Sequence, residues 1–208
     1  MVKLISFVVE KISVKFDFHK LKKLNDLGFI IVEKIVVNLD GLLPVYLDFY
    51  KEMVENEIIL ANISKKDEIL HIGCGSVPST SILISKKTDS RVTAIDKKYK
   101  SVKQAKKLLS RLNLSDKIEI EHKDVSKFHL EKFDLIIVSQ GIKPYNETLD
   151  HISKTMKNGA RLILRTTSSS DGNLADKDSF LNEIFHIGKI VNQKKNGLLI
   201  SVLLSKKQ

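Results

Sequence analysis

A single cysteine, Cys74, is all that this chain of 208 residues contains. One cysteine excludes a disulfide within the chain and fits a reducing compartment, so we expect a cytoplasmic protein. Long apolar runs are missing as well. The apolar first 16 residues are interrupted by charged side chains such as Lys3, Glu10 and Lys11, so we expect neither a secretory signal nor a membrane span there.

Arginine is scarce, although the chain is basic and has a formal net charge of +10. The only arginines are Arg91, Arg111, Arg161 and Arg165. Arginine makes bidentate contacts with phosphates and bases, whereas lysine is often a solubilising surface charge. Nucleic-acid binding is therefore possible but not favoured. The lysine-rich segment from Lys97 to Arg111 contains no acidic residue, and it is either a solvated helix face or a contact for RNA or acidic lipid.

Regular alternation of strand and helix patterns begins at residue 67. Strands are predicted at 68–73, 91–96, 117–122, 133–139 and 160–166, and helices near 78–87, 98–113 and 144–157. Such an alternation predicts parallel βαβ units. Two further apolar runs, 184–191 and 198–204, are joined by a segment that ends in Asn196-Gly197, which predicts an antiparallel hairpin. We therefore expect an α/β, Rossmann-like, seven-stranded, mostly parallel sheet with an antiparallel C-terminal hairpin.

The first 66 residues predict a separate, mainly helical extension. Apolar residues recur at helical spacing near its start, whereas the β-branched segment 29–39 is compatible with either a strand or a helix. A longer helix is predicted over 44–61, with Pro44 at its first turn. The expected organisation is an N-terminal extension over 1–66 and a cofactor-binding domain over 67–208.

The segment from Glu68 to Pro78 is a short apolar strand that ends in a glycine turn and opens directly into a helix. Free backbone N–H groups at such a turn suit a carboxylate or the polar end of a nucleotide-like cofactor. A dinucleotide site requires a third glycine at position 78, beside the pyrophosphate, and this chain has Pro78 there. Nicotinamide and flavin dinucleotides are therefore disfavoured.

Together, this turn and the predicted sheet order resemble the class I S-adenosylmethionine-dependent methyltransferase fold from residue 67 to the end. The resemblance implies S-adenosylmethionine as the cofactor. Asp96, at the end of the second strand, is expected to accept hydrogen bonds from the ribose hydroxyls, or else to cap the following helix. Asp124 is expected beside the adenine amine, or else as a cap, and Ser139 at the reacting end. The predicted cofactor-binding residues are Gly73, Cys74, Gly75, Ser76, Pro78, Thr80, Asp96, Lys97, Asp124, Val125, Ser139 and Gln140.

Three segments are also similar to nicotianamine synthases, which use the same fold to transfer an aminocarboxypropyl group. They are the turn and helix start from Gly75 to Leu83, the strand end Leu162-Ile163-Leu164-Arg165-Thr166, and the tyrosine-containing helix that begins at Pro44. Methyltransferases that act on exocyclic base amines often carry an Asn/Asp-Pro-Pro-aromatic loop after the fourth strand. The segment from Ser139 to Tyr145 lacks it, so base methylation is not favoured.

The acceptor side of the site is predicted on the helix over 44–61. Tyr46 and Tyr50 are one turn apart and Glu57 follows two turns later, so the three could line one side, or else be half-buried core tyrosines and a solvated carboxylate. An amine acceptor must lose a proton in either transfer. Glu57, if partly buried, is the best candidate for the general base, and Tyr46, Tyr50 and Tyr145 are the other candidate catalytic residues.

The expected function is S-adenosylmethionine-dependent methyl transfer to a small-molecule acceptor. The alternative is nicotianamine-synthase-like transfer of a 3-amino-3-carboxypropyl group. A non-catalytic S-adenosylmethionine-binding subunit and an RNA methyltransferase are further alternatives. The histidines show no metal-ligand spacing with Cys74, so no metal is expected. No membrane partner is expected, and the sequence leaves the oligomeric state open.

Overall fold

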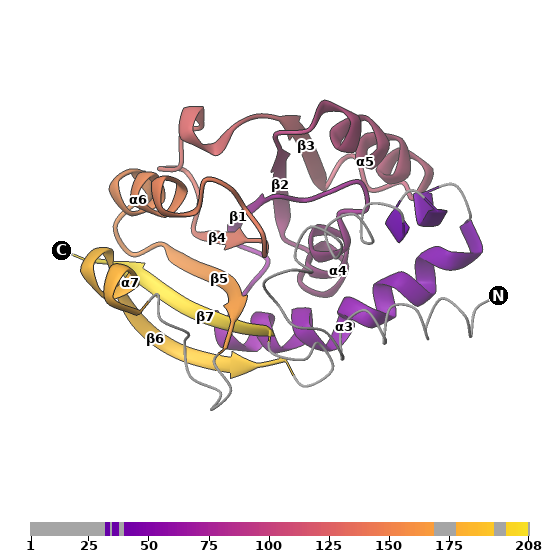
Figure 1. The fold of residues 1–208 in the computed structure, drawn as a ribbon. Helices are drawn as coiled ribbons and strands as arrows, with labels where there is room; N and C mark the ends of the chain where they lie inside the picture. Colours follow the sequence, from indigo (N-terminus) through magenta and orange to yellow (C-terminus); the bar gives the residue numbers. More distant parts are fainter. Residues whose placement is uncertain (1–31, 34, 38–39, 169–177, 194–198, 208) are drawn as a thin grey trace, which may run out of the picture.

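The computed structural model describes residues 32–33, 35–37, 40–168, 178–193 and 199–207. Its centre is a seven-stranded sheet with the strand order β3-β2-β1-β4-β5-β7-β6 (Figure 1). The strands are β1 (Glu68–Ile72), β2 (Arg91–Asp96), β3 (Ile118–His122), β4 (Leu135–Val138), β5 (Arg161–Thr167), β6 (Phe185–Asn192) and β7 (Leu199–Lys206). The helices are η1 (Asp40–Leu42), α3 (Leu43–Leu60), α4 (Ser79–Thr88), α5 (Tyr99–Arg111), η2 (Val125–Lys127), α6 (Tyr145–Thr155) and α7 (Asp178–Ile184).

The first five strands are parallel, paired as β3–β2, β2–β1, β1–β4 and β4–β5, and β7 pairs antiparallel with both β5 and β6. Strands β1 and β4 lie in the middle of the sheet and are buried almost throughout, which explains why each is a short apolar run. Chain order reverses between these two strands, so the loops that follow them diverge at the carboxyl edge of the sheet. The predicted α/β fold with its antiparallel C-terminal hairpin is confirmed.

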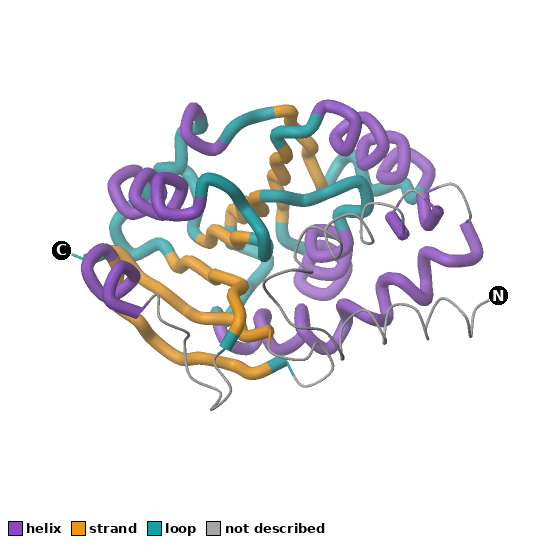
Figure 2. Tube along the Cα trace, in the orientation of Figure 1, coloured by secondary structure: helices purple, strands orange, loops and turns teal. Residues whose placement is uncertain are grey.

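Helices cover both faces of the sheet (Figure 2). Helices α3, α4 and α5 contribute to one apolar core, through residues such as Val54, Ile82 and Ala105. The other core lies against α6 and α7, through residues such as Leu149 and Leu181. The sheet is thus buried between two layers of helices. Loops that connect strands to the following helices lie at its carboxyl edge.

Helix α3 is not a detached element, because Tyr46 and Val54 belong to the same buried cluster as residues of β1 and α4. The sequence left open whether the segment 29–39 is a strand or a helix. Its described residues, 32–33 and 35–37, are helical. The helical patterns expected before residue 29 lie outside the described residues. The boundary at residue 66 stays a prediction.

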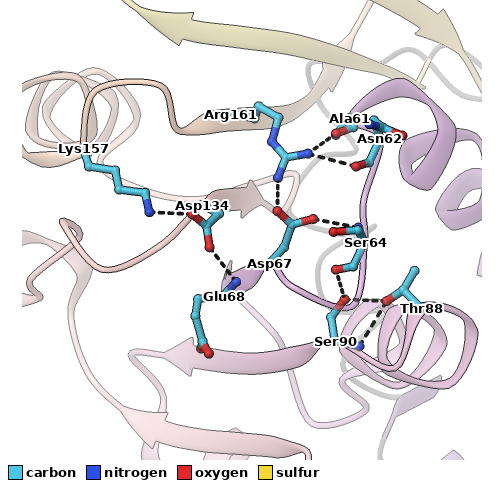
Figure 3. Close-up of polar contacts among 10 residues, drawn as sticks. All are labelled: Ala61, Asn62, Ser64, Asp67, Glu68, Thr88, Ser90, Asp134, Lys157 and Arg161. Atoms are coloured by element: carbon cyan, nitrogen blue, oxygen red, sulfur yellow. Dashed lines mark hydrogen bonds and ion pairs between the residues drawn. The ribbon is translucent and has the colours of Figure 1, made fainter.

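A polar cluster at the amino edge of the sheet anchors the end of α3 (Figure 3). Arg161, at the start of β5, donates to the carbonyl oxygens of Ala61 and Asn62 and forms an ion pair with Asp67. The second oxygen of Asp67 accepts the Ser64 N–H at 2.7 Å, which closes the turn into β1. This cluster lies at the edge opposite to the glycine turn, and it fixes where α3 leaves the sheet.

Membrane-spanning character is not found in the described residues, since none of their helices is both long enough and apolar enough to cross a bilayer.

Candidate functional site

The glycine turn follows β1 and precedes α4, as predicted. Gly73 and Gly75 have φ angles of +81° and +68°, a region that side chains other than glycine rarely adopt. The N–H groups of Gly73 and Cys74 both donate to the carbonyl oxygen of Ile95, at 2.9 and 3.2 Å, so the turn is tied to the end of β2. The chain therefore has a rigid, sharply folded loop at the carboxyl edge, where β1 and β4 diverge.

Asp96 lies directly beside this turn. Its Oδ2 accepts the Gly75 N–H at 3.0 Å, and its Oδ1 accepts the Lys98 N–H at 2.8 Å. The bond to Lys98 closes a local turn before α5, and Lys98, not Asp96, is the N-cap residue of that helix. The structure thus brings the predicted ribose ligand and the glycine turn together, with the carboxylate oriented by backbone donors.

Glu33 is a residue of the site that the sequence did not predict. Its Oε2 accepts the Ser76 N–H at 3.0 Å, and its Oε1 lies 3.5 Å from the Tyr46 hydroxyl, which donates to it. A Cβ atom added to Gly75 would lie only 2.6 Å from Glu33 Oε1. The absence of a side chain at Gly75 is therefore what lets this carboxylate reach the turn.

The environment of Glu33 favours its neutral form. The pKa of this carboxyl is raised from 4.5 to about 7, chiefly by burial and also by the negative charge of Asp96, while the bonds from Ser76 and Tyr46 oppose the shift. A carboxyl group with a pKa near neutrality can take up and release a proton at physiological pH, which suits a general base. Burial also raises the pKa of the Cys74 thiol, so this cysteine stays protonated and lines the turn as a small apolar group.

Tyr46 and Tyr50 lie together on α3, with their hydroxyl oxygens 3.3 Å apart and their ring centroids 5.1 Å apart. Tyr46 is 6% exposed, and burial is the main cause that raises the pKa of both hydroxyls. Both phenols are therefore neutral near pH 7 and act as hydrogen-bond donors and acceptors. Tyr46 belongs to the apolar core and Tyr50 packs against it, as the alternative for this pair expected. Tyr46 also contacts Glu33 beside the turn, and a catalytic role of the two tyrosines stays a prediction.

Glu57, the predicted general base, lies elsewhere. Its side chain is completely buried, and its two oxygens accept from Nε and Nη2 of Arg165 at 2.7 and 2.6 Å. The Ser201 hydroxyl donates to it as well, at 2.6 Å. The expectation of a partly buried, available carboxylate is not met at this position. Glu33 has the partial burial and the raised pKa that the prediction required of Glu57, and it lies beside the turn.

Ser139, at the end of β4, faces the same turn. A Cβ atom on Gly73 would lie 3.3 Å from its Cβ. Its hydroxyl is 2.9 Å from Nε2 of the buried His71, whose Nδ1 is 2.8 Å from the Ser81 hydroxyl on α4. Burial, helped by the charge of Arg165, lowers the pKa of His71 to about 3, so the ring is neutral and links the two serines.

The other predicted residues are spread along the carboxyl edge. Thr80 is buried in the first turn of α4, and Lys97 Nζ donates to the Lys143 carbonyl at 2.7 Å. Asp124 accepts the Ser126 N–H at 3.0 Å, so the capping alternative is present in the structure, and contact with adenine stays a prediction. Three further predicted residues differ in exposure: Val125 is buried in the core, Tyr145 is half-buried and Gln140 is exposed.

Metal ligation finds no support in the part of the chain that the structure describes, where no cluster of three or more His, Cys, Asp or Glu side chains could hold an ion. The carboxyl ends of β1, β2 and β4, with Glu33 beside them, instead bring two carboxylates and hydroxyls together at the glycine turn, whose N–H groups are bonded to Ile95, Asp96 and Glu33. This donor and acceptor set fits a cofactor that has a ribose and an amino-acid part.

Comparison with known proteins gives consistent results. The family model described as nicotianamine synthase protein matches residues 39–207. The crystal structure of MtNAS in complex with MTA and tNA is similar, with a TM-score of 0.76 and 20% identity over 96% of this chain and 86% of that chain. A glutamate-to-glutamine mutant of MtNAS in complex with S-adenosylmethionine has a TM-score of 0.71, with 20% identity over 96% and 88%.

A putative S-adenosyl-L-methionine-dependent methyltransferase from Methanococcus maripaludis has a TM-score of 0.67 and 18% identity, over 85% of this chain and 92% of that chain. Among curated protein sequences, none matches. At these levels of identity the structural neighbours establish the fold.

Proposed function

The chain belongs to the nicotianamine synthase protein family, and from that premise we propose that it is an S-adenosylmethionine-dependent enzyme that transfers a 3-amino-3-carboxypropyl group to the amine of a small acceptor. The observation that carries the proposal is the family match over 39–207. The position of Glu33 against the glycine turn supports it. Methyl transfer, the first choice from the sequence, becomes the second candidate.

The predicted membership of the class I methyltransferase-like superfamily, with nicotianamine-synthase features, is confirmed. S-adenosylmethionine is the cofactor, as predicted, since it is the cofactor of the family. The neighbour that was solved with MTA supports the choice between the two transfers. Methylthioadenosine is what S-adenosylmethionine leaves behind when its aminocarboxypropyl group is transferred, whereas methyl transfer leaves S-adenosylhomocysteine.

The cofactor supplies a sulfonium whose bond to the methionine side-chain carbon breaks as the acceptor nitrogen bonds to that carbon, with the electron pair leaving on the thioether sulfur. The protein has two tasks in this reaction. It must hold the reactants in line, and it must accept the proton that the amine loses. We assign the first task to the backbone of the glycine turn, Asp96 and Ser139, and the second to Glu33.

Glu33 suits the proton-accepting task for physical reasons. With a pKa of about 7 it is partly ionised at neutral pH, and in the ionised form it can accept a proton from an ammonium or a reacting amine. The Tyr46 hydroxyl donates to the same carboxylate and orients it. Tyr46 and Cys74 are both buried beside it, which limits the access of water to this part of the site.

One incubation tests the proposal. The purified chain is mixed with S-adenosylmethionine labelled in the adenosine part and with a panel of free α-amino acids, and the nucleoside products are separated by chromatography. Labelled methylthioadenosine, formed in proportion to a new amino-acid adduct, is the expected result. Labelled S-adenosylhomocysteine would establish methyl transfer instead. Cofactor binding without either product would favour a non-catalytic binding protein.

Spontaneous breakdown of S-adenosylmethionine also releases methylthioadenosine, so the incubation needs a matched control. A Glu33→Gln variant supplies it, because the substitution keeps the shape of the side chain and removes its basicity. Product that depends on both Glu33 and an acceptor is enzymatic. A small-molecule acceptor remains part of the proposal, and an RNA substrate added to the same incubation tests the alternative.

A further inference from the structure

Glu57 and Arg165 form an ion pair at the junction of α3, β5 and β7, with side chains that are 0% and 5% exposed. Arg165 uses two nitrogens on the two carboxylate oxygens, and Ser201 of β7 adds a third donor at 2.6 Å. All three donors come from the sheet, whereas the carboxylate comes from the helix. The pair therefore joins α3 to the sheet, and no step of the proposed chemistry uses it.

A neighbouring contact repeats this link. Asn56, which precedes Glu57 on α3, donates from Nδ2 to Gln193 Oε1 at 3.1 Å. Gln193 is 2% exposed, lies just after β6, and donates in turn to the Ser201 hydroxyl at 2.9 Å. Two consecutive residues of one helix are thus bonded to the C-terminal hairpin. Together they fix both the axial position and the rotation of α3.

The tyrosines of the site share this face of α3. Positions 46, 50 and 57 are four and seven residues apart, so they form one narrow stripe along the helix. A shift of α3 by one residue would move each side chain by about 1.5 Å and turn it by about 100°. The Tyr46 to Glu33 contact is already 3.5 Å long, so it would not survive such a shift.

From this arrangement we propose that Glu57 and Arg165 are positioning residues, which set the register of α3 on the sheet so that Tyr46 meets Glu33 at the glycine turn. The inference rests on the proposed function, since Glu33 is its general base. Burying two charges costs most of what their attraction returns, so such a pair contributes little net stability. Its contribution here is the placement of one helix.

The test replaces both charges together. Either single substitution leaves a buried charge without its partner, and these variants are expected to unfold. The double variant Glu57→Leu/Arg165→Met keeps the volume and is expected to fold, as judged by circular dichroism and thermal unfolding. Its kcat for group transfer should fall about 10–100-fold, because misplacement by about 1 Å is enough for such a loss. The KM for S-adenosylmethionine should stay near the wild-type value, because Asp96 and the turn are untouched.

A double-mutant cycle separates positioning from simple stabilisation. Tyr46→Phe is measured in the wild-type background and again in the Glu57→Leu/Arg165→Met background. If the ion pair acts through Tyr46, the second effect is much smaller than the first. A purely structural pair would leave the effect of Tyr46→Phe unchanged. The matched control is Asp134→Asn, which weakens the ion pair between Asp134 and Lys157 (Figure 3) and should lower stability but not kcat.

A readout without turnover keeps this inference separate from the proposed function. The Tyr46 bond lowers the pKa of Glu33, so NMR titration of the labelled Glu33 carboxyl reports that contact directly. The Glu33 pKa should rise in Tyr46→Phe and rise equally in the folded double variant. An unchanged Glu33 pKa in the double variant overturns the inference, as does a wild-type kcat. If the wild-type protein transfers no group, the proposed function is wrong. The NMR titration still tests whether the ion pair holds Tyr46 against Glu33.

Discussion

Glu33 and Ser76 are 43 residues apart in the chain, yet the Ser76 N–H donates to the Glu33 carboxylate at 3.0 Å. This bond puts a carboxyl group with a raised pKa onto the turn where the cofactor is expected. Glu33 thereby joins the segment before α3 to the first loop of the sheet. The site is shared between the predicted extension and the predicted domain, and neither part contains it alone.

Glu33→Gln should abolish most of the transfer while leaving cofactor binding intact. Loss of a general base typically reduces the rate by about 10²–10⁴-fold. In the wild-type enzyme, kcat/KM should rise with pH through about 7, because Glu33 loses its proton there. The residual kcat/KM of the variant should not show this rise. Steady-state kinetics between pH 5.5 and 9, in roughly half-unit steps around the pKa, measure both quantities. The same substitution at the exposed Glu119 on β3 is the control and should change neither.

Glu33→Gln should also stabilise the fold at alkaline pH. The folded-state pKa is raised, so the native chain binds a proton more tightly than the unfolded chain, and stability falls as pH rises from 4.5 to about 7. Glutamine does not ionise, so the variant should recover at most about 3 kcal/mol at pH 8. Urea unfolding at pH 8 measures this. An equally stable variant would show that Glu33 is not held in the buried site.

Gly75→Ala should impair the reaction more than it impairs folding. The new Cβ would lie 2.6 Å from Glu33 Oε1, so the carboxylate must move away from the turn. The matched control is Gly159→Ala, where φ is also positive, at +79°, but nothing lies within 4 Å of the new atom. Both variants should lose roughly 1–2 kcal/mol through backbone strain. Only Gly75→Ala should lose activity, and equal turnover in the two variants would contradict the assignment of Glu33.

The fold was predictable because each element has a strong local pattern. Strands β1 and β4 are apolar runs of the length expected for the middle of a parallel sheet, and α5 has an apolar stripe opposite a lysine-rich face. The predicted bounds of these elements differ from the observed ones by two residues or fewer. The C-terminal hairpin followed from its turn composition, and β6 and β7 do pair antiparallel.

Glu33 could not be found in the same way. It lies in a β-branched segment whose pattern fits a strand as well as a helix, so the direction of its side chain could not be assigned from the sequence. One signal was present: a carboxylate in the middle of an apolar run must find partners if it is buried. Glu57 illustrates the converse. Its helical spacing from Tyr46 and Tyr50 gave the correct face, but its partner, Arg165, is 108 residues away.

Asp96→Asn should weaken cofactor binding. Both oxygens of Asp96 accept backbone N–H groups, and each can accept a further hydrogen bond, as the predicted contact with the ribose hydroxyls requires. Removing the charge from such hydrogen bonds costs about 1.5–3 kcal/mol, so the dissociation constant should rise about 10–100-fold. Isothermal titration with S-adenosylmethionine measures it. Asp89→Asn is the control, since Asp89 lies at the opposite edge of the sheet and pairs with the surface lysines Lys65 and Lys117. Equal affinities in the two variants would remove Asp96 from the ribose site.

His71 should make the wild-type fold sensitive to acid. Its pKa is about 3 in the folded state and 6.5 in the unfolded state, so between these values the unfolded chain binds a proton that the folded chain does not bind. The free energy of unfolding therefore decreases as pH falls below 6.5. Full expression of this shift would remove at most roughly 4–5 kcal/mol. Glu33 acts in the opposite direction between pH 7 and 4.5, so the two groups partly cancel in that window and the net loss should steepen below it.

The two contributions separate in a His71→Gln variant, because glutamine can bond to both Ser81 and Ser139 but does not titrate. Urea unfolding is measured at pH 7.5, 6, 5 and 4, values that span the window set by the histidine and carboxyl pKa values. The free energy of unfolding of the variant should depend less on pH than that of the wild type, and it should rise slightly as Glu33 takes up its proton. The control is His122→Gln, which removes an exposed histidine and should follow the wild-type curve. If His71→Gln also followed that curve, His71 would not be held neutral between the two serines, and its link from α4 to the end of β4 would have to be discarded.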